Sequence, residues 1–144
     1  MLKEMYEQPK AIADTFSPRI KDGRIVIEEL GMSEEEIRDI QKIMIVACGS
    51  ASHVGYSGKY ILEGLARIPV EVDMASEFRY RNPILDEHTL VIVVSQSGET
   101  ADTLAALRES KKRGARVLGI VNVVGSSIAR EADNVMYTWA GPEI

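Results

Sequence analysis

Residues 90–100 read LVIVVSQSGET, a short and continuous apolar run followed at once by small polar residues. A continuous apolar run of this length is typical of a strand that is buried on both faces of a parallel sheet. The runs at 43–48 and 117–121 have the same character. A helical pattern follows each run, and this alternation of strands with helices predicts an α/β fold.

Two further segments, at 70–74 and 135–139, alternate apolar with polar residues, which indicates half-exposed strands at the edges of the sheet. Numbered along the chain, the second and the fifth strand are then the edges, which favours the spatial order 2-1-3-4-5. This is the flavodoxin-like order of a doubly wound sheet. We therefore expect three layers, α/β/α, with a five-stranded parallel sheet in the middle.

The residues before the first buried strand predict a separate unit. We expect an N-terminal helical extension over 1–42 that packs on a domain over 43–144. A helical pattern covers the first 20 residues, where Pro9 either lies in a first turn or breaks the helix. The apolar positions of that pattern are Leu2, Met5, Tyr6, Ile12 and Phe16.

The rest of the extension holds one clear helix signal. Residues 17–32 look irregular because proline and glycine interrupt them. Ser33 and Glu36 have the spacing of a capping box, which predicts a short helix from about 34 to 41. Beyond the first buried strand, a longer helix carries an apolar stripe made of Val54, Ile61, Leu62 and Leu65.

The composition disfavours several classes of protein. With 144 residues, of which 45% are hydrophobic and 27% charged, the chain has the make-up of one globular domain. A net charge of −5 disfavours nucleic-acid binding, and the apolar runs are too short to cross a membrane. The single cysteine, Cys48, favours a reducing compartment, and the first residues lack a secretion signal, so we expect a cytoplasmic location.

No metal and no cofactor are expected. The two histidines and the one cysteine form no cluster with metal-ligand spacing. No lysine follows Gly98 as it would in a Walker-type phosphate loop. The spacing of Gly49, Gly55 and Gly58 differs from the dinucleotide-binding fingerprint, which disfavours a nicotinamide cofactor.

A candidate binding site follows from the strand order. Strands 43–48 and 90–94 lie side by side at the topological switch point, where ligands bind beyond the carboxyl ends of the strands. The loops at 49–52 and 95–100 both begin there and are rich in serine and glycine. The second loop opens a helix, whose free N–H groups favour an anion. The side chains expected around a phosphate or carboxylate are Ser95, Ser97 and Thr100, with Gln96 directed toward a sugar hydroxyl.

Each of these residues also has a purely structural interpretation. Ser97 could cap the helix with Thr100 in its first turn, although the loop's composition and its placement both favour an anion site. Cys48 and His53 could form a nucleophile pair, but a small buried thiol and a polar residue at a helix start are the favoured interpretations. We find no convincing acid–base pair and therefore assign no catalytic residue.

Two more polar clusters follow strands. One follows the strand at 70–74 and consists of Glu77, Arg79, Tyr80 and Arg81. These residues either help to bind an anionic ligand, form a subunit interface or simply lie on the solvated surface. The other follows the strand at 117–121 and either shapes a pocket wall or caps a helix through Ser126. It consists of Asn122, Gly125, Ser126 and Ser127.

Several stretches together carry a family resemblance. They are 48–50 (CGS), 75–81 (ASEFRYR), 95–103 (SQSGETADT), 122–130 (NVVGSSIAR) and 140–144 (AGPEI), with MLKE at 1–4 and QP at 8–9. With them the chain resembles the sugar isomerase (SIS) family over essentially its whole length. The resemblance implies that 43–144 is a phosphosugar-binding SIS domain, in which Ser95, Ser97 and Thr100 hold the phosphate.

The resemblance also implies the rest of the binding set. By it, Gln96 and Ser50 contact the sugar or the phosphate, and Cys48 and Gly49 complete the substrate-binding residues. The family commonly has Cys-Gly-Thr-Ser where this chain reads CGSA at 48–51. Ser50 keeps the hydroxyl of the threonine, whereas Ala51 lacks the second hydroxyl and so loses one contact.

Within the family, the stretches are most similar to the first of two SIS halves in enzymes that move glutamine-derived ammonia onto fructose 6-phosphate and isomerise the product to glucosamine 6-phosphate. The implied ligand is fructose 6-phosphate or glucosamine 6-phosphate, and the implied assembly is a homodimer. The sequence lacks the glutaminase domain and the second half of such enzymes, so we expect binding without full catalysis. The alternative is a standalone phosphosugar-sensing or dimerisation module.

Overall fold

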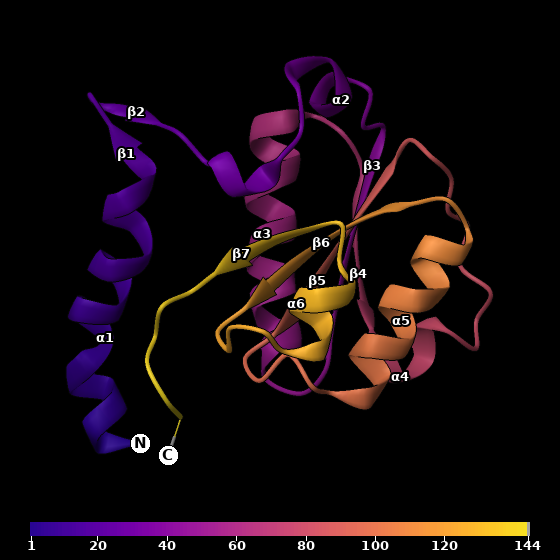
Figure 1. Ribbon diagram of the computed structural model, residues 1–144. Helices are drawn as coiled ribbons and strands as arrows, with labels where there is room; N and C mark the ends of the chain where they lie inside the picture. Colours follow the sequence, from indigo (N-terminus) through magenta and orange to yellow (C-terminus); the bar gives the residue numbers. More distant parts are fainter. Residues whose placement is uncertain (144) are drawn as a thin grey trace.

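A parallel sheet forms the centre of the molecule in a computed structural model, which describes residues 1–143 (Figure 1). Its strands are β3 (Lys42–Ala47), β4 (Val70–Met74), β5 (Thr89–Ser95), β6 (Arg116–Val121) and β7 (Asn134–Tyr137). They pair in the order β4-β3-β5-β6-β7, and every neighbouring pair is parallel. The predicted order 2-1-3-4-5 is confirmed. Of the matching stretch 140–144, Ile144 lies outside the described residues.

The strands differ in burial between the centre and the edges of the sheet, as their sequences predict. The central strands β3 and β5 are buried almost throughout, and β6 is buried at four of its six positions. In the edge strand β4, Val70 is buried whereas Glu71 and Met74 are exposed, and all four residues of β7 are half-buried, so the predicted alternation is not seen residue by residue. A strand that is covered on both faces must be apolar on both, which is why its run is continuous.

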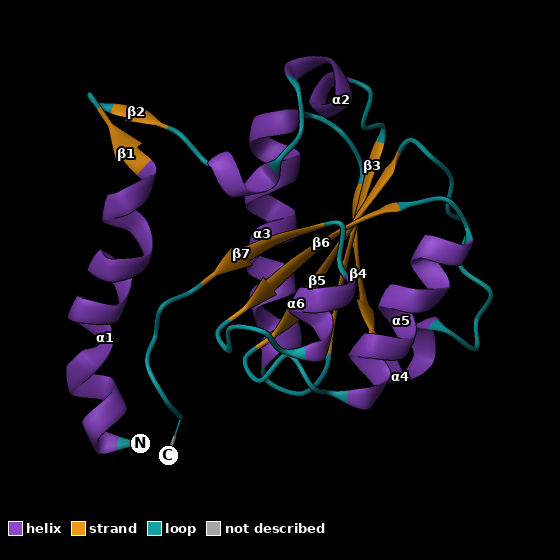
Figure 2. Cartoon of the chain, in the orientation of Figure 1, coloured by secondary structure: helices purple, strands orange, loops and turns teal. Residues whose placement is uncertain are grey.

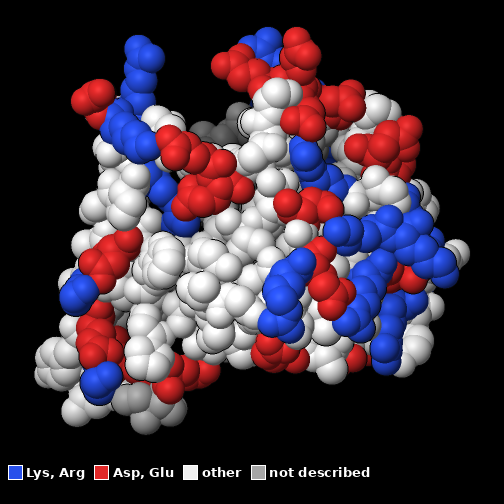
Figure 3. Space-filling view, viewed as in Figure 1, with Lys and Arg blue, Asp and Glu red and all other residues white. Residues whose placement is uncertain are grey.

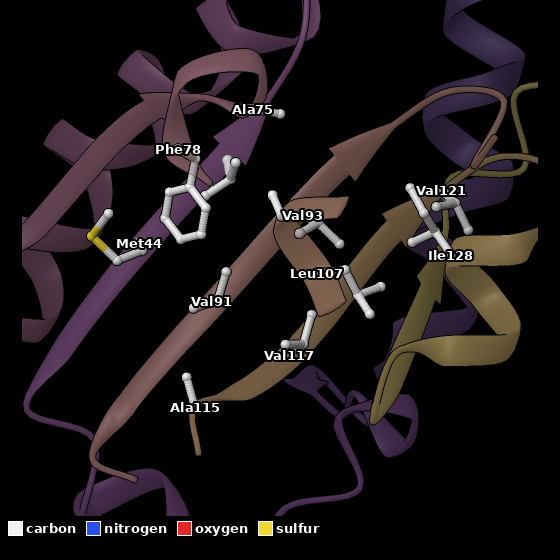
Figure 4. Close-up of a cluster of buried hydrophobic side chains, with 12 residues drawn as sticks. Met44, Ala75, Phe78, Val91, Val93, Leu107, Ala115, Val117, Val121 and Ile128 are labelled. Atoms are coloured by element: carbon white, nitrogen blue, oxygen red, sulfur yellow. The ribbon is translucent and has the colours of Figure 1, made fainter. Parts of the chain in front are cut away.

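Helices cover both faces of the sheet and make three layers (Figure 2). On one face lie α4 (Ala75–Phe78), α5 (Ala101–Lys112) and α6 (Ser127–Glu131), packed on the larger apolar cluster. Figure 4 shows part of this cluster, with Phe78 beside Met44 of β3 and Leu107 beside Val93 of β5 and Val117 of β6. On the other face lies α3 (Ala51–Ala66), whose Leu62 packs on a second cluster around Ile45.

The helix α3 contacts the sheet through small residues rather than through its apolar stripe. A Cβ atom on Gly55 would lie 2.9 Å from Val72 Cγ1, so only glycine allows this close approach. Leu62 is half-buried, but Val54, Ile61 and Leu65 are 62%, 59% and 81% exposed. The predicted helix is therefore confirmed, whereas most of its stripe points away from the core.

The N-terminal extension contains more regular structure than its sequence indicates. It consists of α1 (Leu2–Phe16), the 3-10 turns Ser17–Arg19 and Glu28–Leu30, the strands β1 (Ile20–Lys21) and β2 (Arg24–Ile25), and α2 (Glu34–Arg38). The helix α1 continues through Pro9. The segment 17–32, predicted to be irregular, holds the β1–β2 hairpin.

The capping box at the start of α2 is confirmed. The Glu36 N–H donates to Ser33 Oγ at 3.2 Å, and the Ser33 N–H donates to a Glu36 carboxylate oxygen at 2.7 Å. The helix ends at Arg38, which is earlier than predicted. The local signal fixed where this helix starts, and its end is set by the turn into β3.

The helix α1 turns its polar side toward the rest of the chain. Figure 1 shows it standing apart from the sheet, beside the C-terminal tail. Its half-buried residues include Glu4, Glu7, Ala11 and Thr15. The exposed ones are its apolar residues Leu2, Met5, Tyr6, Ile12 and Phe16. This is the reverse of an amphipathic helix that packs on its own core.

A buried arginine holds the extension to the sheet. Arg19 is only 8% exposed. Its guanidinium donates to the carbonyl oxygens of Thr15 at 2.8 Å and Tyr137 at 2.9 Å, and it forms an ion pair with Glu29 at 2.9 Å. Three segments, namely the end of α1, the end of β7 and the turn Glu28–Leu30, therefore meet at one side chain.

None of the helices in the described part of the chain combines the length and the apolar composition needed to cross a bilayer.

We expect Arg19→Ala to lower the free energy of unfolding by about 2 kcal/mol, because hydrogen bonds to a charged, buried group are lost and carbonyl acceptors are left behind. This corresponds to a decrease of roughly 4–8 °C in the midpoint of thermal unfolding. Ile12→Ala is the matched control, since Ile12 is 64% exposed and its truncation should change the midpoint little. Equal midpoints for the two variants would contradict the anchoring role of Arg19.

Candidate functional site

The pairing of β3 with β5 brings the two predicted loops together. In this pair Ala47 is opposite Val94, so the loops that follow leave the sheet side by side. They line a hollow of about 290 Å³. The predicted site residues in its wall are Cys48, Gly49, Ser50, Ser95, Gln96, Ser97 and Thr100, and Ala51 lines it too.

The hydroxyl groups of the loop 95–100, here named the phosphate loop, are held by its own backbone. Ser95 Oγ accepts from the Gly98 N–H at 3.1 Å, and Ser97 Oγ accepts from the Glu99 N–H at 3.2 Å. Ser95 Oγ also lies 3.2 Å from Thr100 Oγ1. Because each serine oxygen already accepts a hydrogen bond, its O–H is suited to donate, and an anion needs donors.

The helix α5 begins at this loop without a side-chain cap. Thr100 occupies its N-cap position, but its side chain makes no capping hydrogen bond to the N–H groups of the first turn. Those N–H groups have no acceptor within the helix. Ser97 accepts from Glu99 instead, so the alternative in which Ser97 caps α5 is not what the structure shows. Uncapped N–H groups and nearby hydroxyls together suit an anion.

Gly98 makes the turn of the phosphate loop possible. Its φ of +67° lies in the left-handed region that favours glycine. A Cβ atom added there would also lie 2.0 Å from Ser126 Oγ, a clash that the buried Ser126 could not avoid. Both the conformation and the close packing therefore require glycine at this position.

The polar cluster after β6 supports the loop from behind and lies outside the wall of the hollow. Ser126 occupies the N-cap of α6 but makes no side-chain cap, and its buried hydroxyl has no hydrogen-bond partner among residues 1–143. The Glu99 carboxylate accepts from the Ser127 N–H at 2.7 Å instead. The side-chain amide of Asn122 donates to the Gly141 carbonyl at 2.6 Å and thereby holds the C-terminal tail. Helix capping by Ser126 was a wrong prediction. Asn122 does line a pocket wall, as the alternative predicted, but that pocket lies beside α1 and is separate from this hollow.

The Cys48 and His53 side chains do not form a pair in this hollow. Cys48 is half-buried and packs against the larger apolar cluster, as a small hydrophobic residue does. His53 is exposed on α3 and does not line the hollow. Glu143 does line it, although the sequence offers no local signal for this placement, because the tail reaches the site only through tertiary contacts.

The cluster after β4 lies outside the hollow as well. Arg79 stacks over the Tyr80 ring, with its guanidinium carbon 4.6 Å from the ring centroid, and lies 3.9 Å from Asp102 of α5. Arg81 forms an ion pair with Asp73. These side chains are exposed, as both the interface and the solvated-surface interpretation require.

Charged side chains elsewhere on the surface are largely paired. Figure 3 shows basic groups gathered over α5 with acidic groups between them. Arg108 lies 2.6 Å from Glu131, and Lys111 lies 2.8 Å from Asp133. Among residues 1–143, no group of three or more His, Cys, Asp or Glu side chains is arranged to hold a metal ion.

A larger hollow of about 930 Å³ lies between α1 and the C-terminal tail. Its wall includes Ala13, Pro18, Val123, Trp139 and Pro142, and its charged members are Asp14 and Glu29. Its wall lacks the convergent hydroxyl groups of the phosphate loop. The smaller hollow is therefore the candidate site.

Known proteins share this sequence and this fold. The sequence profile of the SIS domain matches residues 36–144. The isomerizing glutamine–fructose-6-phosphate aminotransferases of Clostridium tetani and Caldanaerobacter subterraneus are 66% and 62% identical over 100% of this chain. The chain spans 24% of the length of each.

Solved structures give the same result. The C-terminal domain of glucosamine-fructose-6-phosphate aminotransferase from Francisella tularensis superimposes with a TM-score of 0.91 and 42% identity, over 99% of this chain and 40% of that one. A putative phosphosugar isomerase from Bacillus subtilis has a TM-score of 0.65 and 34% identity, over 68% of this chain and 30% of that one. With its profile, its sheet order and its loops in agreement, the chain belongs to the SIS domain family.

Proposed function

We propose that this chain is a sugar-phosphate-binding domain and that its ligand is fructose 6-phosphate or glucosamine 6-phosphate. The observation that carries the proposal is the set of serine hydroxyls, already hydrogen-bonded as acceptors, beside the uncapped start of α5. The names of the aminotransferase relatives support the choice of a hexose 6-phosphate.

Each of the predicted site residues in the wall of the hollow then has a role. The hydroxyls of Ser95, Ser97 and Thr100 hold the phosphate together with the first N–H groups of α5. Gln96 and Ser50 contact the sugar or the phosphate, from the two loops that meet across β3 and β5. Cys48 and Gly49 complete the wall beneath them.

The proposal is limited to binding. The chain spans about a quarter of the length of its curated relatives, and we assign none of its residues a catalytic role. We propose that residues 43–144 form the binding domain, that 1–42 form an extension packed on it, and that the protein works in the cytoplasm without a metal or a cofactor. In the longer relatives, amino transfer and isomerisation would need groups outside the shared segment.

A second candidate function is self-association. The exposed side chains of Val54, Ile61 and Leu65 form an apolar stripe on α3, and such surfaces mark interaction sites. We propose that two copies of the chain form a homodimer. The same apolar stripe on α3 would suit either a dimerisation module or a phosphosugar-sensing module.

Thermal unfolding with added ligand tests the proposed binding. A ligand at about 100 times its dissociation constant stabilises the folded state by about 2.7 kcal/mol. Each kcal/mol of stabilisation raises the midpoint of thermal unfolding by roughly 2–4 °C, so we expect fructose 6-phosphate and glucosamine 6-phosphate to raise it by several degrees. Glucose and inorganic phosphate, the controls, should have little effect. No shift with either hexose phosphate would contradict binding by this chain.

Replacing the loop glycine should damage both the fold and the binding. We expect Gly98→Ala to lower the free energy of unfolding by about 1–3 kcal/mol through backbone strain, and to abolish the ligand-induced shift because the donor geometry is lost. Gly64→Ala is the matched control, since a Cβ atom at Gly64 meets nothing within 4 Å. That variant should be as stable as the wild type or slightly more stable. An unchanged ligand shift in Gly98→Ala would refute the role of the loop.

Sedimentation equilibrium tests the homodimer. We expect a mass of about twice the 15.9 kDa of one chain, and a return to one chain in Ile61→Glu, which places a charge in the apolar stripe. His53→Glu, on the same helix, serves as a control for added charge alone. A mass near that of a single chain for the wild type at high concentration would argue against the dimer.

A further inference from the structure

Three hydrogen bonds join the phosphate loop to the segment after β6. The Asn122 N–H donates to the Gln96 carbonyl at 3.1 Å, and the Ile128 N–H donates to the Gly98 carbonyl at 3.0 Å. Both bonds join backbone groups, so almost any residue could make them. The third tie is the Glu99 carboxylate, which accepts from the Ser127 N–H at 2.7 Å. This one depends on a particular side chain.

The Glu99 carboxylate takes the place that a helix N-cap side chain usually fills. Ser126 stands at the N-cap of α6 but makes no cap, and its buried hydroxyl faces Gly98 instead. The start of α6 is therefore satisfied by a residue of the phosphate loop. Glu99 is 28 positions away from Ser127 along the chain, so the bond joins two separate loops.

The electrostatics of this contact favour a fixed carboxylate. Hydrogen bonds from the side chain and the backbone N–H of Ser127 hold the pKa of the Glu99 carboxyl below its ordinary value, and the positive charge of Arg130 acts in the same direction. These hydrogen bonds therefore favour the ionised form of Glu99, which is the form that accepts from Ser127. Left free, a negative charge next to Thr100 and two residues from Ser97 would repel a phosphate.

We propose that Glu99 is a positioning residue, which fixes the phosphate loop in its donor geometry and holds its own negative charge on α6, away from the bound phosphate. The identity of the ligand in this inference rests on the proposed function. The hydrogen bond between Glu99 and Ser127 rests on the structure alone. It predicts that the contact with Ser127 matters for affinity more than for global stability. Glu99 does not contact the ligand itself and acts through Ser97 and Gly98.

Binding of glucosamine 6-phosphate, measured by calorimetry, tests the effect on affinity. We expect Glu99→Ala to weaken binding on the order of tenfold, as the loss of a charge-assisted hydrogen bond would. Glu99→Gln should stay within about threefold of the wild type, because an amide oxygen can still accept from Ser127. If Glu99 were only a nearby repulsive charge, both variants would bind more tightly than the wild type, and that result would overturn the proposal.

Glu131→Ala is the matched control. Glu131 also ties α6 to α5 through an exposed carboxylate, which accepts from Arg108 at 2.8 and 2.6 Å, but it lies at the far end of α6. Its loss should leave the affinity for glucosamine 6-phosphate unchanged. An equal loss of affinity in Glu131→Ala and Glu99→Ala would show a general effect of loosening α6 and would refute a specific role for Glu99.

Amide hydrogen exchange in the ligand-free protein separates this inference from the proposed function. Glu99→Ala should speed exchange of the Gly98 and Ile128 amides severalfold, whereas Glu131→Ala should not. If the wild type binds no hexose phosphate, the proposed function fails and the exchange experiment still decides the tie. Unchanged exchange in Glu99→Ala would overturn the inference whether or not the ligand binds.

Discussion

The parallel pairing of β3 with β5 is the constraint on which the candidate site depends. It sets Ala47 opposite Val94, so that two loops far apart in the sequence emerge next to each other. From that point α3 leaves toward one face of the sheet and α5 toward the other, since they pack on different apolar clusters. The two helices thus diverge from this edge of the sheet, and the space between the loops that precede them is the hollow lined by Ser50 and Ser95.

Within that opening, the phosphate loop is held in shape before any ligand arrives. Its serine oxygens accept from its own N–H groups, and Gly98 adopts a conformation that other residues rarely adopt. The segment after β6 supports it from behind through backbone bonds and through Glu99. Ordering a flexible loop on binding costs free energy, so a loop that is fixed in advance retains more of the interaction energy as affinity.

The helices α1 and α3 both have exposed apolar side chains that do not pack on the sheet. The helix α1 is anchored by the buried Arg19 and by polar contacts, while its apolar side chains are exposed. The stripe on α3 is exposed for a related reason, because Gly55 lets the helix backbone approach β3 and β4 without large side chains in between. Apolar helix faces of this kind are stabilised when another protein surface covers them.

The sequence by itself determined the sheet order, because a strand covered on both faces must be apolar throughout and an edge strand need not be. It also placed the start of α2 at Ser33 and brought Ser95 through Thr100 to the carboxyl edge of the sheet, since these depend on local patterns and on the rules of parallel sheets. Only the tertiary structure decided which side chains from separate segments contact one another. Glu99 caps α6 in place of Ser126, Glu143 reaches the hollow, and Arg19 joins α1 to β7. Periodicity reports burial and conformation along one segment, whereas these contacts depend on how separate segments are oriented once they have packed.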